Sequence, residues 1–181
     1  MRVLGVDPGS KVCGFGVLEV NGEKLVHIES GALAPGASLP MQKRLQGIFE
    51  GLCGVIARTR PECMSIETVF YSKNAQSSLK LGQARGVALL AAAISDMPVH
   101  EYAPSEIKLA LCGRGRANKA EVRKIVSLLV GIDDWATSDV SDAVAIAICH
   151  INLSETKDIL GVSSLPMRRK RRRFRKDDIP A

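Results

Sequence analysis

The sequence predicts an α/β fold in which a mixed five-stranded sheet is flanked by helices. Strand-like runs near the N-terminus are joined by a hairpin, whereas later runs are separated by helical stretches, so antiparallel and parallel pairing should coexist in one sheet. The 181 residues, 46% hydrophobic and 24% charged, suit one folded domain and exclude a disordered chain. No apolar run reaches the roughly 18 residues that a membrane helix needs, so we expect no membrane span.

The first 28 residues read as three strands. Residues 3–6 form a short apolar run, as expected of a strand covered on both faces, and Asp7-Pro8-Gly9-Ser10 ends it. Residues 15–20 and 25–28 flank Asn21-Gly22, a pair that accepts positive φ and closes tight hairpins. These runs predict the antiparallel part of the sheet.

The rest of the domain alternates helices and strands. Asn118 and Glu121 are spaced as a capping box, and the following helix should bury a face containing Val122, Val126 and Leu129. The expected elements are a helix over 40–59, a strand over 63–66, a helix over 76–96, a strand over 99–102, a short helix from Pro104, a helix from 118 and a segment over 139–150. That last segment fits a buried helix or a strand; its length and initial polar cluster favour a helix.

Two glycines, Gly82 and Gly86, lie four residues apart in the predicted 76–96 helix. Small residues at that spacing allow another backbone to approach closely. Packing against the chain's own sheet and packing against a second copy of the chain explain this pattern equally well.

The formal charge of +6 is concentrated near the C-terminus. Residues 168–176, RRKRRRFRK, hold eight of the 25 basic residues, whereas residues 1–166 contain 17 acidic and 17 basic residues. Because periodicity fades beyond about residue 153, we divide the chain into a folded domain, 1–153, and a basic tail, 154–181, which we expect to be disordered. Any binding of nucleic acid by the domain must depend on where its charges lie.

The cysteines and histidines predict no metal site or disulfide framework. The five cysteines are odd in number, widely spaced and form no CxxC pair, so they read as buried reduced thiols. We assign His27, His100 and His150 to structural positions. The sequence begins with a strand-like run and no signal-peptide pattern, and we expect a cytoplasmic protein.

Four acids stand at strand or helix boundaries. Asp7 and Glu67 end predicted buried strands, and Asp139 and Asp142 lie three apart at the start of an apolar helix. Each position has an ordinary structural reading as a turn former, strand end or helix cap. Together they predict an oxygen-only site for Mg²⁺ or Mn²⁺ in which two divalent ions would offset the carboxylate repulsion and serve phosphodiester hydrolysis.

Three segments resemble the signature blocks of RuvC-type Holliday junction resolvases. They are VLGVDPGSKVCGFGV near the start of the chain, IETVFYSKNAQSSLKLGQARG from Ile66 to Gly86, and SDVSDAVAIAICH from Ser138 to His150. The similarity is collinear over residues 1–150, and the basic tail is not part of it. Actin-like ATPases and kinases share an Asp-Gly turn like the opening one, but their chains are two-lobed and far longer.

The resemblance implies a ribonuclease H-like fold and a homodimer that nicks two strands of a four-way DNA junction. It implies Mg²⁺ dependence, 5′-phosphate products and a branch-migration complex as partner. By motif, Asp7, Glu67, Asp139 and Asp142 would be the catalytic acids and metal ligands. Two alternatives remain: an actin-like ATPase or kinase fragment, which would turn over nucleotide, and a non-catalytic junction-binding module, which would give no Mg²⁺-dependent product.

Basic and aromatic side chains supply candidate DNA contacts. A basic loop and helix start between 104 and 124 carry the candidates Lys108, Arg114, Arg116, Lys119 and Arg123, where a helix N-terminus favours phosphate. A solvated helix face beside a loop is an equally good reading of this pattern. The resemblance assigns Phe70 to stacking on a base and leaves Tyr71 undecided.

Overall fold

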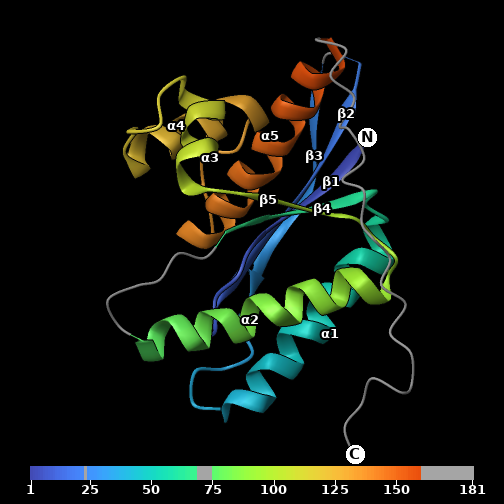
Figure 1. Cartoon of the computed structure of the whole chain (residues 1–181), viewed down its shortest axis with the longest axis vertical. Coiled ribbons are helices and arrows are strands. Elements are labelled where there is room, and N and C mark those ends of the chain that lie inside the picture. Colours follow the sequence, from blue (N-terminus) through green and yellow to red (C-terminus); the bar gives the residue numbers. More distant parts are fainter. Residues whose placement is uncertain (23, 69–74, 160–181) are drawn as a thin grey trace, which may run out of the picture.

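A five-stranded mixed sheet forms the centre of the protein (Figure 1). The computed structural model describes residues 1–22, 24–68 and 75–159. The strands are arranged in the order β3-β2-β1-β4-β5. Their bounds are β1 (Arg2–Asp7), β2 (Cys13–Asn21), β3 (Lys24–Leu33), β4 (Cys63–Glu67) and β5 (Val99–Tyr102).

The pairing combines an antiparallel half and a parallel half. Strand β2 pairs antiparallel with both β1 and β3, whereas β4 pairs parallel with β1 and with β5. The sequence prediction of a mixed sheet, opened by a hairpin and extended through helical crossovers, is therefore confirmed.

Helices cover both faces of this sheet. Figure 1 shows α1 (Met41–Thr59) and α2 (Ala75–Ile94) together on one side. The other side carries α3 (Pro104–Cys112), α4 (Lys119–Val130) and α5 (Ser138–Ile159). Alternation along β1 divides its side chains between two cores: Val3 packs with α5, and Leu4 and Val6 pack with α1 and α2.

Helix α5 lies directly on strands β1 and β2. A Cβ atom added at Gly5 would lie 2.0 Å from the carbonyl oxygen of Ala143, and one added at Gly14 would lie 2.0 Å from that of Asp139. Neither position has room for a side chain, so the absence of a Cβ is what permits this close approach. Residues 139–150, for which the sequence allowed either a helix or a strand, belong to helix α5, which continues past residue 153 to Ile159.

Helix α4 begins as predicted, but one of its predicted core residues is wrong. The Asn118 side chain accepts a hydrogen bond from the Glu121 amide, and the Glu121 carboxylate accepts one from the Asn118 amide. Val122 and Val126 are buried, whereas Leu129 is 47% exposed. Ser127, which the spacing did not predict, is buried instead, and its hydroxyl accepts a hydrogen bond of 2.9 Å from the Trp135 indole.

The remaining local predictions have mixed outcomes. All five cysteines are free; Cys13, Cys63 and Cys149 are buried and the other two are half-buried. Apart from the neighbouring residues of α2 itself, no described atom lies within 4 Å of a Cβ added at Gly82 or Gly86, so these glycines do not serve packing against the chain's own sheet. Within the described residues, no helix combines the length and apolar character needed to cross a lipid bilayer.

Candidate active site

The four predicted acids meet at one edge of the sheet because of the strand order. Strands β1 and β4 are parallel neighbours, with Val6 opposite Ile66, so Asp7 and Glu67 end them side by side. The first turns of α5 carry Asp139 and Asp142, and the contact at Gly14 places this end of the helix over the neighbouring strand β2. Three separate elements thus deliver carboxylates to one place.

The acids interact strongly with one another. The pKa of Asp7 is raised to about 7, first by burial and then by the nearby charges of Asp142, Glu67 and Asp139. Burial also raises the pKa of Glu67, assisted by the charge of Asp142. Desolvation and like-charge repulsion both penalise the charged forms, so a cation at this position would relieve an existing electrostatic strain.

The four carboxylates interact electrostatically, but their oxygens are not packed tightly together. Among residues 1–22, 24–68 and 75–159, the donor atoms that all lie within 4.8 Å of one another belong to Cys63, His100 and His150, and no three of the four carboxylates approach that closely. Bare like charges are destabilising at short range, so a cation between the carboxylates would favour a closer approach.

A lysine supplies a positive charge within this site. The Lys119 ammonium lies 2.7 Å from the Asp142 carboxylate, and its charge lowers the pKa of both Asp7 and Glu67. The hydrogen bond to Asp142, followed by the charges of Asp142, Asp7 and Asp139, raises the pKa of Lys119 itself against the opposing effect of its burial. Lys119 therefore interacts with the whole acidic cluster.

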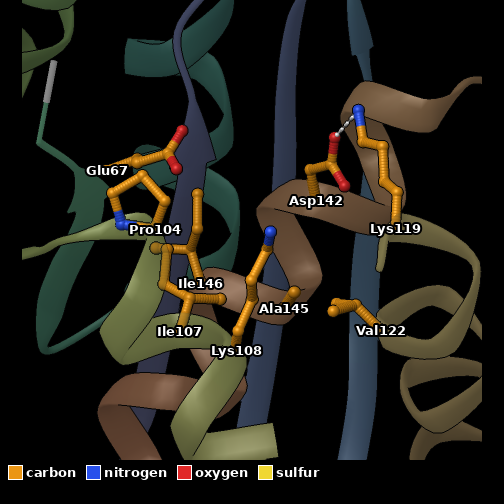
Figure 2. Close-up of a pocket in the computed structure, with 9 residues that line it drawn as sticks. All are labelled: Glu67, Pro104, Ile107, Lys108, Lys119, Val122, Asp142, Ala145 and Ile146. Atoms are coloured by element: carbon orange, nitrogen blue, oxygen red, sulfur yellow. Dashed lines mark ion pairs between the residues drawn. The ribbon is translucent and has the colours of Figure 1, made fainter. Parts of the chain in front are cut away.

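A cavity of about 290 Å³ is bordered by two of the acids, Glu67 and Asp142, and by Lys108 and Lys119 (Figure 2). Figure 2 shows Glu67 on one side and the Lys119–Asp142 ion pair on the other, with Lys108 reaching up between them. The lower wall is apolar and comes from α3, α4 and α5; it includes Ile107, Val122 and Ile146. Polar groups of both signs thus stand at the mouth of a partly apolar hollow.

The donor set fits hard divalent cations. Every acid at the edge offers carboxylate oxygen, which Mg²⁺ and Mn²⁺ prefer, and the raised pKa values of Asp7 and Glu67 reflect burial first and the neighbouring negative charges second. Asp7, Glu67, Asp139 and Asp142 are the residues that could hold such ions.

The predicted DNA-contact residues divide into two groups. Lys108 and Lys119 line the cavity beside the acids. Arg114, Arg116 and Arg123 do not line it, and all three are exposed. Arg114 forms an ion pair of 2.6 Å with Glu121, the residue that also caps α4. Phe70 and Tyr71 lie outside the described residues.

A second hollow on the far side of Asp139 was missed by the sequence analysis. Its volume is about 510 Å³, and it is lined by the loop after β1 and by the start of α2, with Lys11 and Lys80 as its cations. The signal in the sequence was a lysine directly after the Asp7-Pro8-Gly9-Ser10 turn, which by itself is indistinguishable from an ordinary polar loop residue.

Comparison with known proteins gives a consistent family. The family model described as "Crossover junction endodeoxyribonuclease RuvC" matches residues 3–150. A relative of that name from Geobacter metallireducens is 47% identical over 160 residues, which cover 88% of this chain and 98% of the relative.

Solved structures agree with the sequence match. The Thermus thermophilus RuvC structure is 32% identical, covers 86% of this chain and 96% of its own, and superposes with a TM-score of 0.79. The same protein in complex with a Holliday junction substrate gives a TM-score of 0.81 at the same identity and coverage. The mixed sheet with helices on both faces is the ribonuclease H-like fold that the sequence analysis expects.

Proposed function

Because the chain belongs to the RuvC family of crossover junction endodeoxyribonucleases, we propose that its four carboxylates form the catalytic centre with which it resolves Holliday junctions. The observation that carries the proposal is the electrostatic coupling of Asp7 to Glu67, Asp139 and Asp142, three acids supplied by two other elements. A structural role alone would not require four acids from three elements to be held close enough to interact.

The four acids would hold two Mg²⁺ ions, with Mn²⁺ as a possible substitute. When bound, such ions supply the activation of water and the stabilisation of the departing oxyanion in phosphodiester hydrolysis. Asp7 and Glu67 offer ligands from the rigid ends of two paired strands, and Asp139 and Asp142 offer ligands from a helix packed directly on the sheet. Ligands on such elements hold their positions better than ligands on loops.

The reaction forms a bond between a water oxygen and the scissile phosphorus and breaks the bond from phosphorus to the 3′ oxygen. The 3′ oxygen takes up a proton, and the products are a 5′-phosphate and a 3′-hydroxyl. Lys108 and Lys119 lie beside the acids, where an ammonium group can orient the phosphate and offset its developing charge. Lys119 now pairs with Asp142, and a cation held by Asp142 would leave the Lys119 ammonium available for this contact.

Resolution of a four-way junction requires two nicks on strands related by symmetry. A homodimer supplies two identical centres with that symmetry. Phe70 would stack on an unpaired base near the junction centre, and Arg114, Arg116 and Arg123 would contact phosphates outside the cavity. A branch-migration complex is the proposed partner that delivers the junction.

The basic tail would add affinity without taking part in cleavage. Residues 168–176 carry eight positive charges, whereas residues 1–166 have no net charge. Deleting residues 167–181 should reduce both DNA affinity and its dependence on salt, because fewer counterions are released on binding. Cleavage at saturating protein should be unchanged; its loss in a folded, dimeric truncation would contradict this division.

One cleavage assay tests the catalytic proposal. Purified protein is incubated with an end-labelled four-way junction, with and without Mg²⁺, and with linear duplex as substrate control. Wild type should give paired nicks only with Mg²⁺, and ligation of the nicked strands without prior phosphorylation reports the 5′-phosphate. Asp7→Asn should bind the junction without cutting it, and Asp133→Asn, at an exposed acid after α4, should cut normally.

Two outcomes would contradict the proposal. Near-normal cleavage by Asp7→Asn would remove the carboxylate cluster from the chemistry. Junction binding without any Mg²⁺-dependent product from wild type would instead support a non-catalytic binding module.

A further inference from the structure

Two histidines and a cysteine from three different elements lie together beneath the other half of α5. Cys63 begins β4, His100 lies on β5, and His150 lies within α5. One ligand atom from each residue can be chosen so that all three lie within 4.8 Å of one another. The carboxylate site is remote, because Glu67 stands four residues along β4 from Cys63, a distance of about 13 Å in an extended strand.

The His150 imidazole is held on both of its nitrogens. Its Nε2 lies 3.3 Å from the Cys63 sulfur, and its Nδ1 lies 2.6 Å from the Tyr102 hydroxyl. The His100 ring lies against the His150 ring, with centroids 4.3 Å apart. Histidines that bind metal through one nitrogen are usually oriented by a hydrogen bond at the other, and Tyr102 occupies that orienting position.

Most of the side chains in this cluster are buried, unlike those of an ordinary group of surface residues. Cys63 and His150 are each 5% exposed and Tyr102 is 8% exposed, whereas the His100 side chain is exposed. The cluster is therefore walled by protein on one side and reachable through His100 on the other. Burial raises the pKa of Cys63 to about 11, so the thiol is protonated until a cation stabilises the thiolate.

We propose that Cys63, His100 and His150 form a site for a borderline-soft divalent cation such as Zn²⁺. One thiolate and two imidazoles are the donors that Zn²⁺ selects, and the Mg²⁺ expected at the carboxylates does not favour them. Binding displaces the Cys63 proton to solvent, and the Zn–S bond replaces the S–H bond. The bound ion would fasten β4, β5 and α5 to one another.

Cobalt provides a direct spectroscopic test. Co²⁺ is added to the purified full-length protein at neutral pH, and the thiolate-to-cobalt charge-transfer band in the near ultraviolet is followed. Co²⁺ bound at an oxygen-only site gives no such band, so the signal reports the cysteine. One equivalent of Zn²⁺ should abolish the band by displacement, and excess Mg²⁺ should leave it intact.

Matched variants assign the signal to this cluster. Cys63→Ser and His100→Ala should lose the band, whereas Cys53→Ser and His27→Ala, a half-buried thiol and a strand histidine elsewhere, should keep it. Tyr102→Phe should weaken Zn²⁺ binding about 10- to 100-fold. Should Cys63→Ser fail to fold, His100→Ala still decides the question because its side chain is exposed.

The result is independent of the catalytic proposal. Asp7→Asn should keep the charge-transfer band and also the rise in melting temperature that Zn²⁺ gives wild type. The proposal is overturned if wild type shows no band, or if His100→Ala binds Zn²⁺ as tightly as wild type. Either outcome would leave a hydrogen-bonded cluster that binds no metal and would not alter the carboxylate chemistry.

Discussion

The two ends of α5 hold polar groups in opposite ways. At its N-terminal end, Asp139 and Asp142 join Asp7 in a cluster of like charges that burial and repulsion make costly. Further along, His150 is held by Cys63 and Tyr102 through contacts of 3.3 Å at Nε2 and 2.6 Å at Nδ1. One end is electrostatically unsatisfied and the other is satisfied internally.

This difference shows what each end requires. A group of acids persists at a cavity mouth only if another requirement outweighs its energetic penalty, and cation-dependent catalysis is such a requirement. The buried Cys63 thiol and His150 imidazole already have hydrogen-bond partners, so a cation bound there would add stability to an already stable arrangement. Substitutions at each end should therefore change stability in opposite directions.

The largest expected loss of stability comes from Gly5, which lies under α5 between the two ends. In Gly5→Ala, the new Cβ would meet the backbone of Ala143 and Ala147, which cannot move as a flexible side chain does. We expect a loss of about 3 kcal/mol in the free energy of unfolding, measured by urea denaturation. Gly82→Ala is the control, because its position is open in the described structure and alanine favours a helix.

Gly5→Ala should thus lower the free energy of unfolding, whereas Gly82→Ala should raise it slightly. A Gly5→Ala protein as stable as wild type would show that α5 is not in direct contact with β1. A destabilised Gly82→Ala protein would instead indicate that another backbone, such as that of a second copy, packs against α2.

Asp7→Asn should stabilise the metal-free protein, and the gain should depend on pH. The folded pKa of Asp7 is about 7, above the value of about 3.9 expected in the unfolded chain, so ionisation opposes folding. The penalty is absent below about pH 4, grows between about pH 4 and 7, and is complete above that range. The variant should exceed wild type by about 2 to 4 kcal/mol at pH 8 in a chelator.

Urea denaturation from pH 4 to 8 checks this expectation. Added Mg²⁺ should narrow the difference by stabilising wild type at the carboxylates. A gap that stays constant across this pH range would contradict the raised pKa, and a variant less stable than wild type at pH 8 would contradict the repulsion.

Tyr102→Phe tests the internally satisfied end. Removing the hydroxyl takes away the 2.6 Å contact with His150 Nδ1 inside the core, and we expect a loss of about 1 to 2 kcal/mol in the free energy of unfolding. Thermal and urea unfolding measure it, with junction cleavage at saturating protein as the control for the distant carboxylate end. Unchanged stability would show that the hydroxyl does not support His150.

Lys119→Ala should give the smallest change in stability. The Lys119 side chain is 71% exposed and its Asp142 partner 26%, so solvent screens the ion pair and less than about 1 kcal/mol is expected. Junction binding at low salt should nevertheless weaken, because a cation at the cavity is lost. Lys124→Ala, an exposed lysine on the same helix, is the matched control; equal binding by the two variants would contradict a specific role for Lys119.

Local signals made much of the fold predictable. Asn21-Gly22 located the hairpin and Asn118 with Glu121 located the start of α4, since both depend on residues close in sequence. The predicted burial of Leu129 was wrong because burial on α4 depends on the angle at which that helix packs against its neighbours, and the spacing of apolar residues does not specify this angle. The glycine contacts beneath α5 were likewise beyond prediction, since they join segments more than a hundred residues apart.

The candidate sites differ in the same way. Asp7 and Glu67 could be proposed from the sequence because each directly ends a recognisable buried strand, and parallel strands bring such ends together. The ion pair between Lys119 and Asp142 depends on the packing of α4 near α5, so the sequence could only suggest a basic helix start. Cys63, His100 and His150 form no local pattern and were assigned to separate structural positions.

Helix α5 runs without a break from the carboxylate cluster to His150, and it packs against β1 and β2 without space for a side chain at Gly5 or Gly14. If the helix shifts when cations bind the carboxylates, the position of His150 must shift with it, and the reverse holds as well. Thermodynamic linkage then requires reciprocity: any factor by which Zn²⁺ at Cys63 changes the affinity for Mg²⁺ is the factor by which Mg²⁺ changes the affinity for Zn²⁺. Because α5 packs directly on the strands at Gly5 and Gly14, such a shift would couple cation binding at one end of the helix to the stability of the other.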